Sequence, residues 1–241
     1  MLQENLRALA LAELGRRGLS VPESICERFD NLGHDDPHRI YRLGIMGGTF
    51  DPIHIGHLAC AEQARVAFDL DAVVFIPTGN PVFKRDKKVS DASHRVNMCA
   101  LATADNAHFE VSTLETNREG NTYTVDTLLQ LRAFYPENVK LYFITGADAV
   151  LHIMKWRDSE IISQMAYLIA VTRPGSNLTA EFKEQMRQYT NFETLYLQMT
   201  ALSISSSLLR ELVMKGESIR YLVDPEVYRY IKEQGLYLPE A

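Results

Sequence analysis

The chain has few cysteines and no long apolar run. Only three cysteines, Cys26, Cys60 and Cys99, occur in 241 residues, and none forms a C-x-x-C pair. Neither a disulfide framework nor a cysteine-based metal knuckle is therefore expected. The longest apolar stretches, such as AVVFI and AYLIAV, are far too short to span a bilayer, and the N-terminus lacks a basic region followed by an apolar signal core. These absences predict a cytoplasmic protein with no membrane contact.

Excess positive charge is also absent. The formal net charge is −6, which argues against nucleic-acid binding, because that binding needs a basic surface to displace counterions from phosphates. A small anionic substrate stays compatible, since a cleft responds to nearby charge more than to the molecular total. Lys84, Arg85, Lys87 and Lys88 form a local basic cluster. Such a cluster is more often a solvated loop than a binding site.

The order of apolar and amphipathic segments predicts an α/β fold. Hydrophobic residues make up 46% of the chain, enough for a substantial core in one domain. Strand-like runs occur at 41–46, 72–77, 108–112, 139–145, 166–172 and 194–199. They alternate with helical segments at 55–68, 92–105, 124–135, 178–189, 205–215 and 225–234. This alternation is typical of a Rossmann-like, doubly wound, mostly parallel sheet, which binds ligands outside the carboxyl ends of its strands.

A glycine-rich turn, GGTFDPIHIGH at Gly47 to His57, joins the first predicted strand to the first helix of that pattern. Gly47 and Gly48 can adopt positive φ and let phosphate oxygens approach the backbone. The helix that begins near Ile55 presents unpaired N–H groups and its positive dipole end. The turn therefore predicts a polyphosphate site.

His54 and His57 stand three residues apart in this turn. At that spacing both imidazoles can face the mouth of the turn from one side of the first helical turn. Zinc is the competing interpretation, but Asp51 with two histidines would not close a structural zinc site. We therefore expect no bound metal of the protein's own, and assign the histidines to phosphate.

With these residues in place, GGTFDPIHIGH resembles the signature of the HxGH nucleotidyltransferases, Rossmann-like enzymes that move a nucleotidyl group. Downstream, ISSSLLR at Ile204 to Arg210 resembles their second motif, in which a serine-capped helix start and an arginine hold the ATP phosphates. A serine cluster alone is often an ordinary helix cap. Two motifs in the right order make chance a poor explanation.

The segments between the motifs resemble one branch, the bacterial nicotinate mononucleotide adenylyltransferases. They are IPTGNPVFK at 76–84, NTYTVDTL at 121–128, GAD at 146–148, KWRD at 155–158 and VTRPG at 171–175. The resemblance runs from about Tyr41 to Tyr237. One departure stands before Lys84, where the family often has two prolines and a histidine and this chain has Pro81, Val82 and Phe83.

The resemblance implies that the 5′-phosphate of nicotinate mononucleotide attacks the α-phosphorus of ATP, giving deamido-NAD (nicotinate adenine dinucleotide) and pyrophosphate in NAD biosynthesis. Mg²⁺ would be carried by the triphosphate. No protein nucleophile is required, because the phosphate is already ionised, so catalysis can depend on positioning and charge stabilisation. His54, His57 and Arg210 are the expected catalytic residues, as hydrogen-bond donors to phosphate oxygens.

The same resemblance implies two sets of binding residues. The ATP set comprises Gly47, Gly48, Thr49, Phe50, His54, His57, Gly146, Asp148, Arg173, Ser205, Ser206 and Arg210. The mononucleotide set comprises Thr49, Phe50, Lys84, Thr122, Tyr123, Thr124, Trp156 and Arg157. Trp156 could stack on a pyridine ring, although tryptophan is usually core filler. Arg157, if it turns inward, would favour the carboxylate of nicotinate; outward solvation is equally open.

Other functions stay open at this point. A related adenylyltransferase could use nicotinamide mononucleotide or phosphopantetheine. HIGH at His54 to His57 also matches the motif of class I aminoacyl-tRNA synthetases, but a KMSKS-like lysine loop is missing near the C-terminus. A nucleotide-binding domain without turnover is a more distant alternative, against which the intact His54, His57 and Arg210 argue.

The first 39 residues precede the catalytic pattern. Leu2, Leu6 and Leu9 recur at helical spacing, whereas NLGHDDPHR at 31–39 is polar. We expect residues 1–39 to form an N-terminal helical extension and linker, and residues 40–241 to form the catalytic domain. The helix could dock on that domain or pair two subunits, so the protein could be a monomer or a homo-oligomer. His34 and His38 are expected to be solvated.

Overall fold

The computed structural model describes residues 5–81, 89–150, 152–172, 180–189, 191–200 and 202–239. Its strands are β1 (Tyr41–Gly48), β2 (Ala72–Pro77), β3 (Asn80–Pro81), β4 (Phe109–Val111), β5 (Asn121–Thr122), β6 (Val139–Gly146), β7 (Tyr167–Thr172) and β8 (Thr194–Gln198). Its α-helices are α1 (Leu6–Arg17), α2 (Ile55–Ala67), α3 (Ala92–Thr103), α4 (Thr124–Phe134), α5 (Ala147–Val150), α6 (Ser159–Met165), α7 (Ala180–Tyr189), α8 (Ser206–Met214) and α9 (Pro225–Glu233).

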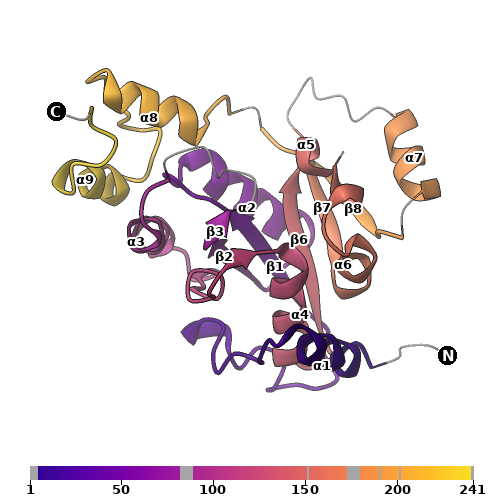
Figure 1. The fold of residues 1–241 in the computed structure, drawn as a ribbon. Helices are drawn as coiled ribbons and strands as arrows, with labels where there is room; N and C mark the ends of the chain where they lie inside the picture. Colours follow the sequence, from indigo (N-terminus) through magenta and orange to yellow (C-terminus); the bar gives the residue numbers. More distant parts are fainter. Residues whose placement is uncertain are drawn as a thin grey trace.

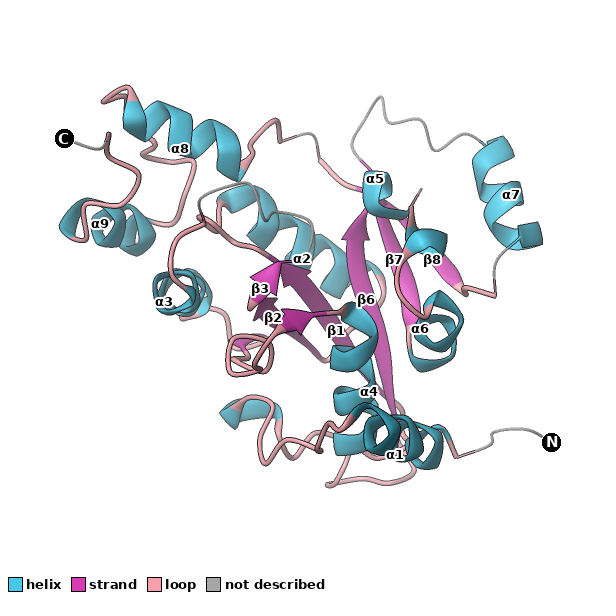
Figure 2. Ribbon diagram, viewed as in Figure 1, coloured by secondary structure: helices cyan, strands magenta, loops and turns pink. Residues whose placement is uncertain are grey.

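Six strands form one parallel sheet in the order β4-β2-β1-β6-β7-β8, with helices on both faces (Figures 1 and 2). The predicted doubly wound fold is confirmed. Strand order reverses between β1 and β6, which are paired from Tyr41 with Val139 to Ile45 with Phe143. The carboxyl ends of these two strands therefore define the crevice where such folds bind ligands.

Alternation along the central strands divides the core into two layers. Leu43 and Ile45 of β1 point to one face, and Met46 points to the other. The first layer also contains Ala10 and Leu14 of α1, Val125, Leu128 and Leu129 of α4, and Ile162 of α6. The second contains Ala61 and Ala64 of α2, Met98 of α3, Leu209 of α8, and Val227 and Ile231 of α9. Parallel strands buried on both faces explain why their sequences are almost wholly apolar.

The predicted boundaries agree with the structure to within about two residues at each described end. β1 runs two residues past the prediction because Gly47 and Gly48 still pair with Ile76 and Pro77 of β2. The sequence prediction missed α5, α6 and the small parallel pair of β3 and β5. These elements are too short to show a hydrophobic period. Among the described residues, no helix is both long and apolar enough to cross a bilayer.

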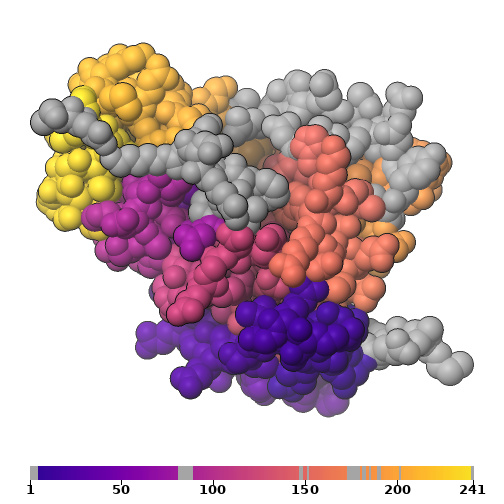
Figure 3. Space-filling view, in the orientation of Figure 1, coloured from indigo at the N-terminus to yellow at the C-terminus, as the bar shows by residue number. Residues whose placement is uncertain are grey.

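The N-terminal helix α1 packs on α4 and contributes to the same core layer (Figure 1). Leu6 and Leu9 are partly buried there, and Leu2 lies outside the described residues. Figure 3 shows the N-terminal segment, in indigo, gathered on the lower side of the molecule.

The polar stretch after α1 is held in place. The side-chain amide nitrogen of Asn138, Nδ2, lies at hydrogen-bond distance from the carbonyl oxygens of Gly33, Asp36 and Arg39, at 2.9, 3.2 and 3.1 Å. Gly33 has a φ of 88°, and a Cβ there would lie 2.6 Å from Val139. His34 stays exposed, as expected of a solvated residue.

Candidate functional site

Two cavities open at the carboxyl ends of β1 and β6. The first, of about 420 Å³, is lined by residues that include Gly47, Phe50, His54, His57, Gly146, Ser205, Ser206 and Arg210. The second, of about 500 Å³, is lined by residues that include Gly48, Thr49, Thr122, Tyr123, Thr124, Trp156 and Arg157. Both cavities share Gly47 and Thr145. Molecules bound in the two cavities would therefore meet at the switch point of the sheet.

The histidine pair forms the floor of the first cavity at the start of α2. His54 is the N-cap of α2, and its ring stacks on the ring of His57 with centroids 3.7 Å apart. The backbone N–H of His54 donates to Nδ1 of His57 at 3.2 Å. Because Nδ1 accepts this bond, the proton of a neutral His57 ring is on Nε2.

The start of α8 faces the histidines across the same cavity. Ser205 caps the helix, with its Oγ accepting from the N–H of Leu208 at 3.2 Å. Ser206 Oγ donates to the carbonyl of Pro52 at 2.9 Å, and Arg210 Nη1 donates to the carbonyl of Asp51 at 2.7 Å. These bonds attach α8 to the GGTFDP turn. Two helix N-termini and one guanidinium thus line the cavity, an arrangement suited to a polyphosphate.

The second cavity lies between the start of α4 and residues 152–158. Trp156 packs edge-on against Phe143, with ring centroids 5.9 Å apart and planes at 82°. The Arg157 guanidinium lies 4.5 Å from the ring centroid of Tyr123 and lines the cavity, although half of the side chain is exposed. The orientation of Arg157, which the sequence left open, is therefore along the cavity wall, over the ring of Tyr123.

Gly48 of the turn provides space for a neighbouring ring, and neither glycine of the turn has a left-handed backbone. Neither Gly47 nor Gly48 has positive φ, so that expectation was wrong; Phe50 has it instead, at 50°. A Cβ on Gly48 would lie 2.9 Å from the ring of Phe50. The ring packs against bare backbone, and both glycines remain in β1 as pairing residues.

Three expected site residues cannot be placed. Lys84 and Arg173 lie outside the described residues, as does the side chain of Asp148, whose backbone belongs to α5. Within the described ranges, no group of three or more His, Cys, Asp and Glu side chains could hold a metal ion. The Asp51 carboxylate accepts hydrogen bonds from the Tyr237 hydroxyl at 2.7 Å and the Ser90 N–H at 3.2 Å. That carboxylate supports the turn.

Comparison with known proteins assigns the family. Residues 45–212 match the cytidylyltransferase-like family model. A protein of Thermoanaerobacter sp. (strain X514), named probable nicotinate-nucleotide adenylyltransferase, is 47% identical over 203 residues, which cover 83% of this chain and 95% of that protein. A relative of the same name from Moorella thermoacetica is 46% identical over 82% of this chain and 92% of its own length. This chain belongs to the nicotinate-nucleotide adenylyltransferase family.

A solved structure agrees with the fold of this adenylyltransferase. The nicotinic acid mononucleotide adenylyltransferase of Plasmodium falciparum, complexed with NaAD, superposes with a TM-score of 0.69. The match has 21% sequence identity and covers 82% of this chain and 97% of that structure's chain.

Sequence reasoning missed two buried polar side chains of this adenylyltransferase site. Arg95, 2% exposed, donates to the carbonyls of Ser90, Thr49 and Thr78 at 3.0, 3.0 and 2.6 Å. Glu115 lines the second cavity and accepts from Thr127 Oγ1 at 2.7 Å; burial raises the pKa of its carboxyl. Both residues lie outside the motifs in sequence, so no local pattern marks them.

We expect Arg95→Met to lower the free energy of unfolding by about 3–5 kcal/mol, because the buried carbonyls of Thr49 and Thr78 would lose their charged donor. Denaturant unfolding measures this loss. Arg187→Met is the matched control, since that side chain is 82% exposed and its replacement should change stability by about 0.5 kcal/mol or less. Equal stability of the two variants would contradict a structural role for Arg95.

Proposed function

We propose that this adenylyltransferase binds ATP in the first cavity and nicotinate mononucleotide in the second, and transfers the adenylyl group between them. The products are nicotinate adenine dinucleotide and pyrophosphate, as in NAD biosynthesis. The shared lining of the two cavities at Gly47 and Thr145 is the observation that carries the proposal. It would bring the mononucleotide phosphate next to the α-phosphorus of ATP.

The reaction is a direct displacement. An oxygen of the mononucleotide phosphate forms a bond to the α-phosphorus, the bond from that phosphorus to the oxygen bridging the β-phosphorus breaks, and pyrophosphate leaves. Charge builds on the α-phosphate oxygens and on the leaving group. His54, His57, Arg210 and the N-terminus of α8 line the cavity in which this charge would develop. Donors fixed before the reaction lower its barrier without reorganisation.

Local charge at the second cavity supports nicotinate as the acceptor base. Lys155 and Arg157 line this cavity, and either cation would favour a carboxylate over a neutral amide. Among the described lining residues, Glu115 is the acidic one, and burial raises the pKa of this carboxyl and so favours its neutral form. Trp156 and Tyr123 provide aromatic surface for the pyridine ring.

We further propose that Mg²⁺ enters with the triphosphate, because the described residues offer no cluster of metal ligands. The three cysteines are buried and form no disulfide, which fits a reducing, cytoplasmic environment. Nucleic acid is not a proposed partner, given the net charge of −6. The division into an extension at 1–39 and a catalytic domain at 40–241 stays a prediction, as does a homo-oligomer.

A pyrophosphate-release assay tests the substrate. ATP and Mg²⁺ are supplied with nicotinate mononucleotide, nicotinamide mononucleotide or phosphopantetheine in parallel, and each adenylylated product is identified by mass. We expect kcat/KM to be at least about tenfold higher with the nicotinate form than with the amide, a difference of ~1.4 kcal/mol.

Each other outcome has a definite meaning. Preference for the amide would refute the assigned base pocket but keep adenylyl transfer. Activity with phosphopantetheine alone would move the chain to a related activity. No pyrophosphate release with any of the three would favour a domain that binds nucleotide without turnover.

A further inference from the structure

An arginine of the N-terminal extension reaches the wall of the second cavity. Arg17 is the last residue of α1, and Gly18 follows it in a left-handed conformation with φ of 66°. The N–H of Leu19 donates to the carbonyl of Leu14 at 3.0 Å, which closes the helix end. Leu14 is buried against the α4 layer of the core. The backbone of Arg17 is therefore fixed relative to α4.

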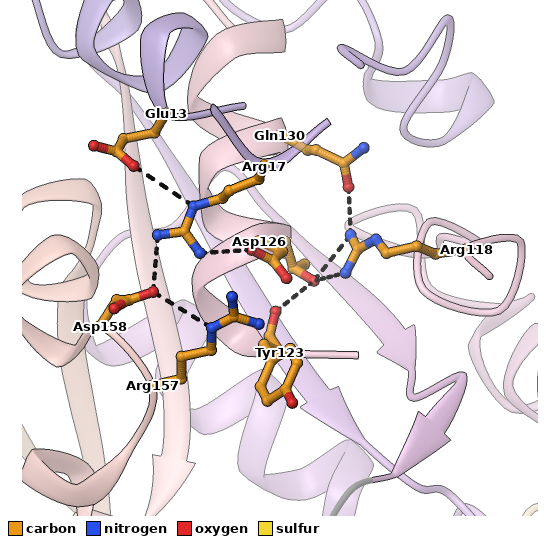
Figure 4. Close-up of polar contacts among 9 residues, drawn as sticks. Glu13, Arg17, Arg118, Tyr123, Asp126, Gln130, Arg157 and Asp158 are labelled. Carbon is orange, nitrogen blue, oxygen red and sulfur yellow. Dashed lines mark hydrogen bonds and ion pairs between the residues drawn. The ribbon is translucent and has the colours of Figure 1, made fainter. Parts of the chain in front are cut away.

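The Arg17 guanidinium contacts Glu13 of its own helix, with Nε 3.6 Å from Oε2, and binds two carboxylates that come from other parts of the chain (Figure 4). Its Nη1 donates to Asp126 Oδ1 at 3.0 Å, and its Nη2 donates to Asp158 Oδ2 at 2.8 Å. The Arg17 side chain is only 13% exposed and that of Asp126 only 9%, so solvent screens this pair weakly. A planar guanidinium is suited to such a bridge because its donors have fixed directions.

Each carboxylate lies close in sequence to residues that line one side of the second cavity. Asp126 is the third residue of α4, two positions after Thr124, and Tyr123 and Thr124 line the cavity. Asp158 follows Trp156 and Arg157, which line the opposite side. Arg17 thus connects the start of α4 to residues 152–158 from behind the cavity, without lining it.

Asp158 also links Arg17 to a cation of the cavity wall. Oδ2 of Asp158 lies 3.6 Å from Nε of Arg157, and it is the same oxygen that accepts from Arg17. Without Arg17, the full charge of Asp158 would act on Arg157 and compete with an anionic ligand for it. Asp126 and Asp158 would also lose the cation between them, and residues 152–158 would lose their connection to α1.

We infer that Arg17 is a positioning residue for the mononucleotide cavity: it holds Trp156 and Arg157 opposite Tyr123 through Asp126 and Asp158. The inference rests on the proposed function for the identity of the ligand. Arg17 lies outside residues 45–212, the part that matches the family model. The N-terminal extension therefore contributes to acceptor binding, in addition to its packing on α4.

Trp156 is the only tryptophan of the chain, so its fluorescence reports on this wall. Titration of the full-length protein with nicotinate mononucleotide, without ATP, gives Kd from the change in emission. Arg17→Gln should raise this Kd about five- to tenfold and increase acrylamide quenching of Trp156, while KM for ATP changes by less than about twofold. Arg17→Lys keeps the charge but loses the two-pronged geometry, so its Kd should lie between those of Arg17→Gln and the unaltered protein.

Arg16→Gln is the matched control. It removes the same charge one residue away, from a side chain that is 67% exposed and pairs with Glu13, and it should behave like the unaltered protein. An unchanged Kd in Arg17→Gln, equal weakening of both substrates, or the same effect in Arg16→Gln would overturn the inference. If Arg17→Gln does not fold, Arg17→Lys decides by the same criteria.

Failure of the proposed function gives a different result. The unaltered protein would then neither bind nor adenylylate nicotinate mononucleotide. Acrylamide quenching needs no ligand, so it would still show whether Arg17 holds Trp156 in place. Unchanged quenching in both Arg17 variants would reject that positioning role independently of the substrate.

Discussion

His57→Ala should lower kcat by about 10²- to 10³-fold while the fold is retained. We expect this loss because His57 lines the first cavity and its Nδ1 accepts from the N–H of His54, which places the proton of a neutral ring on Nε2, the proposed donor to a phosphate oxygen. A donor that stabilises charge developing in the transition state affects kcat more than ground-state binding. Steady-state pyrophosphate release measures kcat, and thermal unfolding checks the fold.

Two further variants separate chemistry from helix capping. His57→Asn retains an oxygen that can accept from the N–H of His54, so α2 should be more stable in this variant than in His57→Ala. Its side chain is shorter than the imidazole, so most activity should still be lost. His94→Ala removes a histidine that contacts the Tyr230 hydroxyl outside both cavities, and should leave kcat within about twofold. Full activity of His57→Ala would refute the catalytic assignment of His57.

Arg210→Ala should lower kcat/KM for ATP about 100-fold, with the Kd of nicotinate mononucleotide unchanged. The guanidinium of Arg210 lines the first cavity and is held by the carbonyl of Asp51 at 2.7 Å. It supplies a permanent cation next to the proposed triphosphate, and charge-assisted hydrogen bonds to phosphate are among the strongest in proteins. Initial rates at varied ATP give the first quantity, and Trp156 fluorescence gives the second.

Arg210→Lys should recover only part of this loss, because an ammonium cannot reproduce the two-pronged geometry of a guanidinium. Arg229→Ala on α9 is the control, since that side chain is 62% exposed and pairs with Glu226. A proportionate loss of binding for both substrates in Arg210→Ala would indicate that this residue supports the fold of the site rather than the phosphates.

The fold could be predicted from sequence because its signals are local. The strands of the main sheet coincide with short, largely apolar runs, such as Ala72–Pro77, and segments with helical spacing alternate with them. The switch point followed from the parallel topology, since the carboxyl ends of β1 and β6 had to adjoin. Short elements such as α6, with seven residues, carry too little periodicity to be recognised.

Most of the candidate site was also recognisable, because its residues occupy contiguous motifs. GGTFDPIHIGH and ISSSLLR predict that His54, His57, Ser205 and Arg210 share one site, and the structure brings these four residues together around one cavity. The motif did not reveal which residues of the turn line which of the two cavities. Gly48 and Thr49 line the second cavity, whereas Phe50 lines the first.

The sequence by itself determined the alternation of strands and helices, the glycine-rich turn between the first strand and helix, and the family, because these depend on neighbouring residues. Only the tertiary structure decided that Gly48 is required for space beside Phe50, that Arg95 holds the turn, and that Arg17 connects Asp126 with Asp158. Apart from the local contact of Gly48 with Phe50, which depends on the φ of Phe50, these contacts join residues that are 46 to 141 positions apart. Contacts of that kind are set by packing of the whole chain, and no local pattern encodes them.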